Sequence, residues 1–282
     1  MPSSRPRWPV VALATLLTAE LLFAGVVVTR APEPAATSAA TALAATPGGQ
    51  REVTLVSLGG IATDPLLRRV ADELDAAVDA VELFWGPEWP HEVVIVAAGS
   101  DAEFRAQATG VADTSHIAAV TVADSVNPQE NSATGQRIVF APGAVTMSPD
   151  ALRLVLTHEL FHYAARAATA ADAPSWITEG VADYVARPAP VGAVARWPLP
   201  VALPSDADFS AAGDPSLAYD RAWLFARYLA DRYGAPALRA FYVRAAGPHH
   251  PDPDTALWEV LRVRPADALR GWQQWCVRNG LA

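Results

Sequence analysis

The sequence predicts an α+β protein, in which a small mixed β-sheet comes first and a helical half follows it. Between residues 51 and 147, short segments rich in β-branched residues alternate with stretches of helical periodicity. From residue 148 to residue 282, apolar residues recur at the spacing of three to four that is typical of helices. Hydrophobic residues make up 51% of the 282 residues and charged residues 18%, so the chain can bury a sizeable core.

The sheet-rich part, residues 51–147, contains four expected strands and two expected helices. The strands are VTLVSL, HEVVIVAAG, HIAAVTVA and RIVFAP, at residues 53–58, 91–99, 116–123 and 137–142. Apolar residues at three-to-four spacing predict a helix over 64–85, and DAEFRAQATG (101–110) predicts a short helix that ends at a glycine. The polar stretch DSVNPQENSATGQ is expected to be a loop before the last strand.

The helical part begins at Ser148, where a serine N-cap, a proline and an acidic residue follow one another. Further helices are expected over about 174–185, from Asp214-Pro215 to Gly234, and over 236–246, 253–262 and 265–278, with a proline-rich crossing at 188–204. Three tryptophans are expected in the core of this part: Trp258, Trp272 and Trp275. The only cysteine, Cys276, lies in the same apolar pattern and is expected to be a small buried hydrophobe.

The N-terminus is typical of an exported protein. Residues 1–30 carry arginines before and after an apolar run from Val10 to Val28, which is either a signal peptide or a membrane anchor. Glu20 opposes the anchor, but no small-residue cleavage site closely follows the run, so we favour a retained single-pass anchor with the rest of the chain outside the cell. The alternative is secretion after cleavage. Residues 31–50, rich in alanine, proline and threonine, predict a flexible linker to a domain at 51–282.

Charge and cysteine content exclude several classes of function. The net charge is −9 and the basic residues are scattered, which excludes the basic stripe of a nucleic-acid-binding protein. A single cysteine forbids an intrachain disulfide and a cysteine-rich zinc site. Any metal ion must therefore be held by histidine and carboxylate side chains.

The stretch LTHELFHYAARAA, residues 156–168, contains the most informative motif. His158 and His162 are four residues apart, so a helix places both imidazoles on one face, where they can share a cation. Glu159 would lie beside the metal and could take a proton from a water there, as in the H-E-x-x-H arrangement of zinc enzymes. The alternative is a surface helix that carries polar residues on its outer face.

The next expected helix, WITEGVADYV at 176–185, supplies what this motif lacks. Glu179 follows His162 by 17 residues, across a short loop suited to an antiparallel return, and is the candidate third ligand of a catalytic Zn²⁺. Asp183 is four residues further on the same helical face, where its carboxylate could accept the remaining ring N–H of a ligating histidine. Two helices thus direct imidazole and carboxylate groups toward one place.

HELFH followed by WITEGVADY resembles the gluzincins, which are thermolysin-like zinc peptidases. It resembles most closely the peptidase MA-like group of exported or membrane-anchored bacterial members, which carry a W-x-x-E-G-x-A-x-Y signature. The resemblance covers about residues 90–280, and its specific part is 157–185. It implies a zincin-like fold with the motif helix at the seam between sheet and helices, zinc bound by His158, His162 and Glu179, Glu159 as general base, and Asp183 supporting a histidine.

The resemblance also suggests two further parts of a catalytic site. Tyr219, in AYDRAWLFARYLADRYG (218–234), is the candidate hydrogen-bond donor to an oxyanion, with Arg221 as a weaker alternative. The alternative is that Tyr219 only packs or faces solvent. RIVFAP is either an edge strand that pairs with an extended peptide or plain sheet core.

The expected function is that of a zinc metallopeptidase acting on a peptide or protein substrate. The G-x-M-E-N motif, with which aminopeptidases bind a free amine, is absent, so an endopeptidase is favoured. The alternative from another class is a non-catalytic, zinc-stabilised extracellular binding domain. Glu159 argues against that alternative, because metal binding alone does not need this acid.

Overall fold

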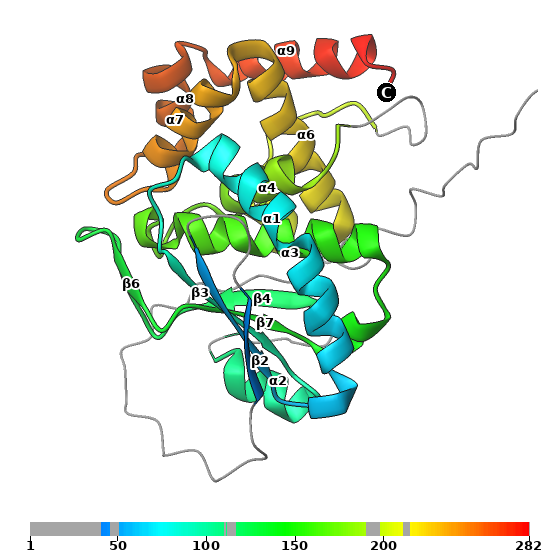
Figure 1. The fold of residues 1–282 in the computed structure, drawn as a ribbon. Helices are drawn as coiled ribbons and strands as arrows, with labels where there is room; N and C mark the ends of the chain where they lie inside the picture. Colours follow the sequence, from blue (N-terminus) through cyan, green and yellow to red (C-terminus); the bar gives the residue numbers. More distant parts are fainter. Residues whose placement is uncertain are drawn as a thin grey trace, which may run out of the picture.

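The computed structural model describes residues 41–45, 51–109, 111, 117–189, 198–210 and 215–281. Its centre is a five-stranded mixed sheet with the order β1-β2-β3-β7-β4 (Figure 1). The strands are β1 (Thr41–Ala45), β2 (Glu52–Ser57), β3 (Glu92–Ala97), β7 (Arg137–Phe140) and β4 (Ala119–Val122). β2, β3 and β7 run parallel to one another, whereas the outer strands β1 and β4 are antiparallel to their neighbours. The small mixed sheet predicted from the sequence is therefore confirmed.

The strand order corrects one prediction. RIVFAP forms β7, which is an interior strand with β3 on one side and β4 on the other. Its backbone groups are already paired, so the expectation that RIVFAP is an edge strand for a peptide is wrong and its other assignment, sheet core, holds. Ile138, Val139 and Phe140 are all fully buried. The strand at this end of the sheet is β4, within HIAAVTVA.

One strand and one β-hairpin lie where the sequence predicts neither. Residues 41–45 of the expected flexible linker form β1, because the outer edge of β2 offers unpaired backbone groups to a neighbouring extended segment. The expected polar loop contains a two-stranded hairpin, β5 (Ser125–Asn127) and β6 (Ser132–Thr134). Asn131 has a φ of 48° at the turn, a conformation that asparagine tolerates better than most residues.

Helices cover both faces of the sheet, as Figure 1 shows, with most of them on one side. The α-helices are α1 (Asp64–Trp85), α2 (Asp101–Gln107), α3 (Pro149–Ala165), α4 (Ser175–Ala186), α5 (Asp206–Ser210), α6 (Pro215–Tyr233), α7 (Ala235–Ala246), α8 (Pro253–Leu261) and α9 (Pro265–Arg278). Within the described ranges, the short 3-10 helices are η2 (Gly60–Ala62), η3 (Pro142–Thr146) and η4 (Arg166–Ala168). A predominantly helical second half is thus confirmed.

α3 lies at the centre of this arrangement. It contacts β4 and β7 of the sheet on one side and α1 and α4 on the other. The larger hydrophobic core extends from this face of the sheet through α1, α3, α4, α6 and α7, whereas a smaller core lies under α2 on the opposite face. The helix that carries the motif is therefore at the seam between the sheet and the helical half.

Two predictions about the helical core have different outcomes. Trp272 and Trp275 are buried, and Cys276 is buried beside them, as expected. Trp258 is 47% exposed, so the expectation that it is core is wrong, because α8 packs through Ala256 and Leu257 instead.

Among the described residues, no helix is long and apolar enough to cross a membrane. The apolar run Val10–Val28 lies outside the described residues.

Candidate metal centre

α3 begins at a serine N-cap and is buried on nearly all sides. Its N-cap is Ser148, whose hydroxyl accepts a hydrogen bond from the backbone N–H of Ala151. From Ala151 to Ala165 every residue except Arg153 is buried. A surface helix would leave one face in solvent, so that alternative for LTHELFHYAARAA is wrong. The polar side chains of the motif point into the interior, where they need partners.

α4 is held against its neighbours at two points. Its first turn lacks a serine or aspartate cap of its own, and Asp206 of α5 accepts a hydrogen bond from the backbone N–H of Trp176 at 3.0 Å. Gly180 lies directly against α6: a Cβ atom at this position would be 2.7 Å from the carbonyl oxygen of Ala222. Only glycine permits this approach of two helix backbones. The close contact fixes the position of the neighbouring Glu179.

His158, His162 and Glu179 converge on one buried point, with ligand atoms all within 4.8 Å of one another. His158 Nε2 is 3.0 Å from His162 Nε2 and 3.2 Å from Glu179 Oε2, and His162 Nε2 is 3.5 Å from Glu179 Oε1. Bond lengths of about 2.0–2.1 Å to zinc imply about 3.3 Å between two ligand atoms of a tetrahedron. The three observed distances bracket that value.

The charge in this cluster needs a positive counterpart. Burial would raise the pKa of Glu179, but the two imidazoles outweigh burial and hold that pKa below its ordinary value. Burial would lower the pKa of His158, yet hydrogen bonds to Asp183 and Glu179 keep it well above the ordinary value. The cluster therefore favours positive charge beside its carboxylates, which a cation bound by the same atoms would supply.

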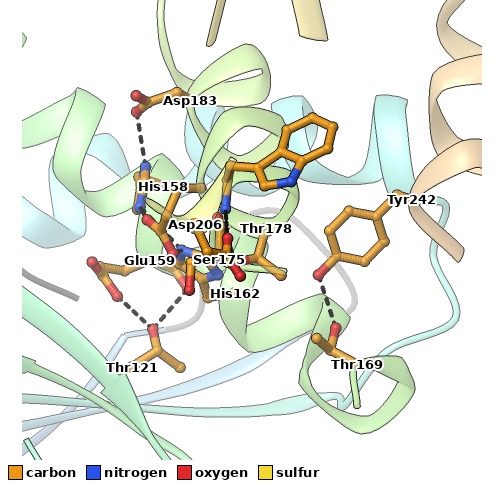
Figure 2. A network of polar contacts seen from close by, with 12 residues as sticks. Thr121, His158, Glu159, His162, Thr169, Ser175, Thr178, Asp183, Asp206 and Tyr242 are labelled. Atoms are coloured by element: carbon orange, nitrogen blue, oxygen red, sulfur yellow. Dashed lines mark hydrogen bonds and ion pairs between the residues drawn. The ribbon is translucent and has the colours of Figure 1, made fainter. Parts of the chain in front are cut away.

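Two carboxylates complete the surroundings of the histidines (Figure 2). Asp183 Oδ1 lies 3.0 Å from His158 Nδ1, so the carboxylate accepts the N–H of this ring and leaves Nε2 directed at the ligand cluster. Glu159 is 2% exposed, and its Oε2 accepts a hydrogen bond of 2.7 Å from the hydroxyl of Thr121. The same hydroxyl lies 2.9 Å from the backbone oxygen of Glu159.

Thr121 is a candidate functional residue that sequence reasoning missed. It lies on the edge strand β4, in the apolar segment AAVTVA, and a single threonine in such a strand gives no sign of its partner. Its side chain shares the sheet face of Ala119 and Ile138, which is the face that α3 covers. Only the pairing of β4 with β7 brings this hydroxyl to the motif helix.

Tyr219 and Arg221 both lie on α6. Tyr219 is buried, and its ring packs edge to face on Phe209 of α5 at 4.9 Å between centroids. Arg221 donates a hydrogen bond to the backbone oxygen of Ala202 at 3.1 Å. These contacts account for packing at both positions, and a role of Tyr219 toward an oxyanion stays a prediction.

No known family model matches the chain, and no curated protein matches it either. The geometry of the buried cluster is therefore the basis for assigning a function.

Proposed function

We propose that the chain is a zinc metallopeptidase with a zincin-like catalytic domain, in which His158, His162 and Glu179 bind the metal. One observation carries the proposal: three buried ligand atoms converge within 4.8 Å of one another, and the residue after the first ligand is a buried carboxylate, Glu159. A structural metal site would not require that second acid. A buried carboxylate is costly unless it has a role or a partner that compensates for its desolvation.

The residues fit a divalent cation in their chemistry. Two imidazoles and one carboxylate are a donor set that zinc enzymes use, with one coordination position left for water. Glu179 Oε1 is a buried oxygen without a hydrogen-bond partner among the described residues, and it lies 3.5 Å from His162 Nε2. An orphaned carboxylate oxygen beside two imidazole nitrogens supports binding of a cation.

In this proposal the chain's own residues divide the work of hydrolysis. Zinc, when bound, would supply an electrophile that lowers the pKa of a water molecule and polarises the substrate carbonyl. Glu159 accepts a proton from the attacking water and later delivers it to the leaving amine. Thr121 donates a hydrogen bond to one oxygen of Glu159, which fixes the orientation of this carboxylate. Asp183 keeps His158 in the tautomer that presents Nε2.

The edge strand β4 is the part of the sheet that could bind an extended peptide. Ala118 O accepts the N–H of Ala141, so alternate residues of β4 direct their backbone groups toward β7. The residues between them, Ala119 and Thr121, direct N–H and C=O away from β7. A peptide substrate would pair with these groups by β-augmentation.

The same proposal includes Tyr219 as an oxyanion donor, endopeptidase specificity and membrane attachment through Val10–Val28.

The decisive experiment compares the wild type with Glu159→Gln in the full-length protein. We expect about one zinc per chain in both proteins, cleavage of members of a broad peptide library by the wild type, and no cleavage by Glu159→Gln. Glu130→Gln, an exposed glutamate of the β5–β6 hairpin, is the matched control and should cleave like the wild type.

Two outcomes would contradict the proposal. If the wild type has no affinity for zinc, the metal centre itself is refuted. If the wild type binds zinc but cleaves nothing in the library, the chain is instead the zinc-stabilised binding domain.

A further inference from the structure

We propose that Arg187 is a positioning residue of the metal centre, which fixes the carboxylate of Asp183 against His158 and connects it to α6. The inference deepens the proposed function and depends on it, because it concerns how the chain holds a ligand of the metal. Neither the H-E-x-x-H motif nor the second helix motif includes Arg187.

A continuous chain of charged contacts leads from the ligand to α6. His158 Nδ1 is 3.0 Å from Asp183 Oδ1, and Arg187 Nη2 is 2.9 Å from the other oxygen of the same carboxylate. Arg187 Nη1 then donates a hydrogen bond of 2.7 Å to Asp220 Oδ1 of α6. Each oxygen of Asp183 thus has a different partner. The carboxylate cannot rotate away from His158 without breaking its ion pair with Arg187.

The position of Arg187 in the chain makes this contact rigid. Arg187 is the C-cap of α4, and its backbone N–H donates to the carbonyl oxygen of Asp183 at 2.8 Å. Arg187 is therefore tied to Asp183 by its backbone as well as by its side chain. The guanidinium also lies over the ring of Trp223, 5.2 Å from the centroid.

The burial of these groups argues that their orientation matters. The side chain of Arg187 is 11% exposed, that of Asp183 is fully buried, and that of Asp220 is 16% exposed. Buried ion pairs contribute little net stability compared with apolar residues of the same volume, although removing one partner is costly. A planar guanidinium holds two carboxylates in fixed directions, which a lysine ammonium cannot do.

Weakened support of a metal-ligating histidine appears as weakened metal affinity. Loss of an outer partner of a ligand typically costs about 10–100-fold in metal affinity. Arg187 acts one contact further out than Asp183, so we expect about a tenfold loss, at the lower end of that range. A merely structural ion pair between α4 and α6 would lower the free energy of unfolding and leave the zinc Kd unchanged.

The experiment measures the zinc Kd of the full-length protein by competition with a chromophoric chelator, and the unfolding free energy of each metal-free variant. Arg187→Met should bind zinc about tenfold more weakly than the wild type. The matched control is Arg153→Met, which breaks another interhelical ion pair, that of Arg153 on α3 with Glu73 on α1, away from the ligands. It should bind zinc like the wild type.

A double-mutant cycle with Asp183→Asn tests the route of the effect. If Arg187 acts through Asp183, Arg187→Met should weaken zinc binding less than twofold when Asp183 is already asparagine. Equal losses in both backgrounds would overturn the proposal, as would an unchanged Kd for Arg187→Met alone. Should Arg187→Met fail to fold, Asp220→Asn weakens the ion pair that holds the guanidinium while keeping Arg187 itself. A wild-type zinc Kd in that variant would equally overturn the proposal. A wild type that binds no zinc would instead refute the proposed function.

Discussion

The close contact between α4 and α6 at Gly180 makes a quantitative prediction for Gly180→Ala. The added Cβ would lie 2.7 Å from the oxygen and 2.8 Å from the carbon of the Ala222 carbonyl, whereas ordinary contact begins at 3.4 Å. Both atoms belong to the backbone of α6, so no side chain can move aside. The two helices must separate locally by about 0.7 Å, the difference between 3.4 Å and 2.7 Å.

We expect this separation to change the free energy of unfolding less than it changes the zinc affinity. Overpacking costs about 1–3 kcal/mol, and the better helix propensity of alanine offsets about 1 kcal/mol of it. A net loss of about 0–2 kcal/mol in unfolding free energy follows from these two contributions. Glu179 is the preceding residue, and metal–ligand distances tolerate shifts of only about 0.2 Å. We therefore expect the zinc affinity to fall about tenfold or more while the fold remains intact.

Chelator competition for zinc and denaturant unfolding of the metal-free protein check both magnitudes. Gly143→Ala is the matched control, because a Cβ there would meet nothing within 4 Å. It should change unfolding by less than about 0.5 kcal/mol, as expected for a surface substitution. A Gly180→Ala variant with the stability and zinc affinity of the control would refute the reasoning that this glycine sets the position of Glu179.

Three more predictions concern the site and its support. Thr121→Val removes the hydroxyl from Glu159, and because a hydrogen bond to a charged group contributes about 1.5–3 kcal/mol, kcat/KM should fall about 10- to 100-fold with zinc content unchanged. Thr121→Ser should recover most of that rate, and no recovery would contradict the assignment. Zinc at 100 times its Kd should stabilise the chain by about 2.7 kcal/mol, so chelation should lower the Tm by about 5–10 °C; an unchanged Tm would mean that no cation stabilises the fold. Burial raises the pKa of Tyr163 to about 12, so the fold favours the neutral phenol, and stability present below pH 10 should decline as pH rises from 10 toward 12. Tyr163→Phe lacks the hydrogen bond to the carbonyl oxygen of Glu92, so its free energy of unfolding at neutral pH should be lower than that of the wild type. Between pH 10 and 12, however, the unfolding free energy measured in urea should fall less steeply in this variant; equal slopes against pH would rule this contribution out.

Local patterns predicted the elements of the fold more accurately than their arrangement. The helix expected at 64–85 has these bounds in the structure, and the expected cap at Ser148 is present, because both depend on nearby residues. The order of the strands depends on distant pairing, which is why the sequence could not decide whether RIVFAP, the segment that forms β7, is an edge strand or sheet core. The short helix α5 was not predicted, since five residues carry too little periodicity to be recognised.

The same distinction applies to the candidate site. The relation of His158, His162, Glu179 and Asp183 follows from helical spacing across one short turn, and the structure brings their side chains together. The contact of Thr121 with the motif helix joins residues 38 apart in the sequence, and that of Arg187 with Asp220 joins residues 33 apart. No periodic pattern within one segment can indicate such pairs, because tertiary packing alone creates them.

The contact between α3 and α4 has a consequence for the order in which the protein forms during synthesis. All three candidate ligands lie within residues 158–179, so the loop between the first and the last is short and costs little entropy to close. A cation could therefore join the two helices before residues 187–282 have been synthesised. Asp220, by contrast, becomes available only after α6 emerges, so the outer support of His158 would be completed later than the ligand set itself.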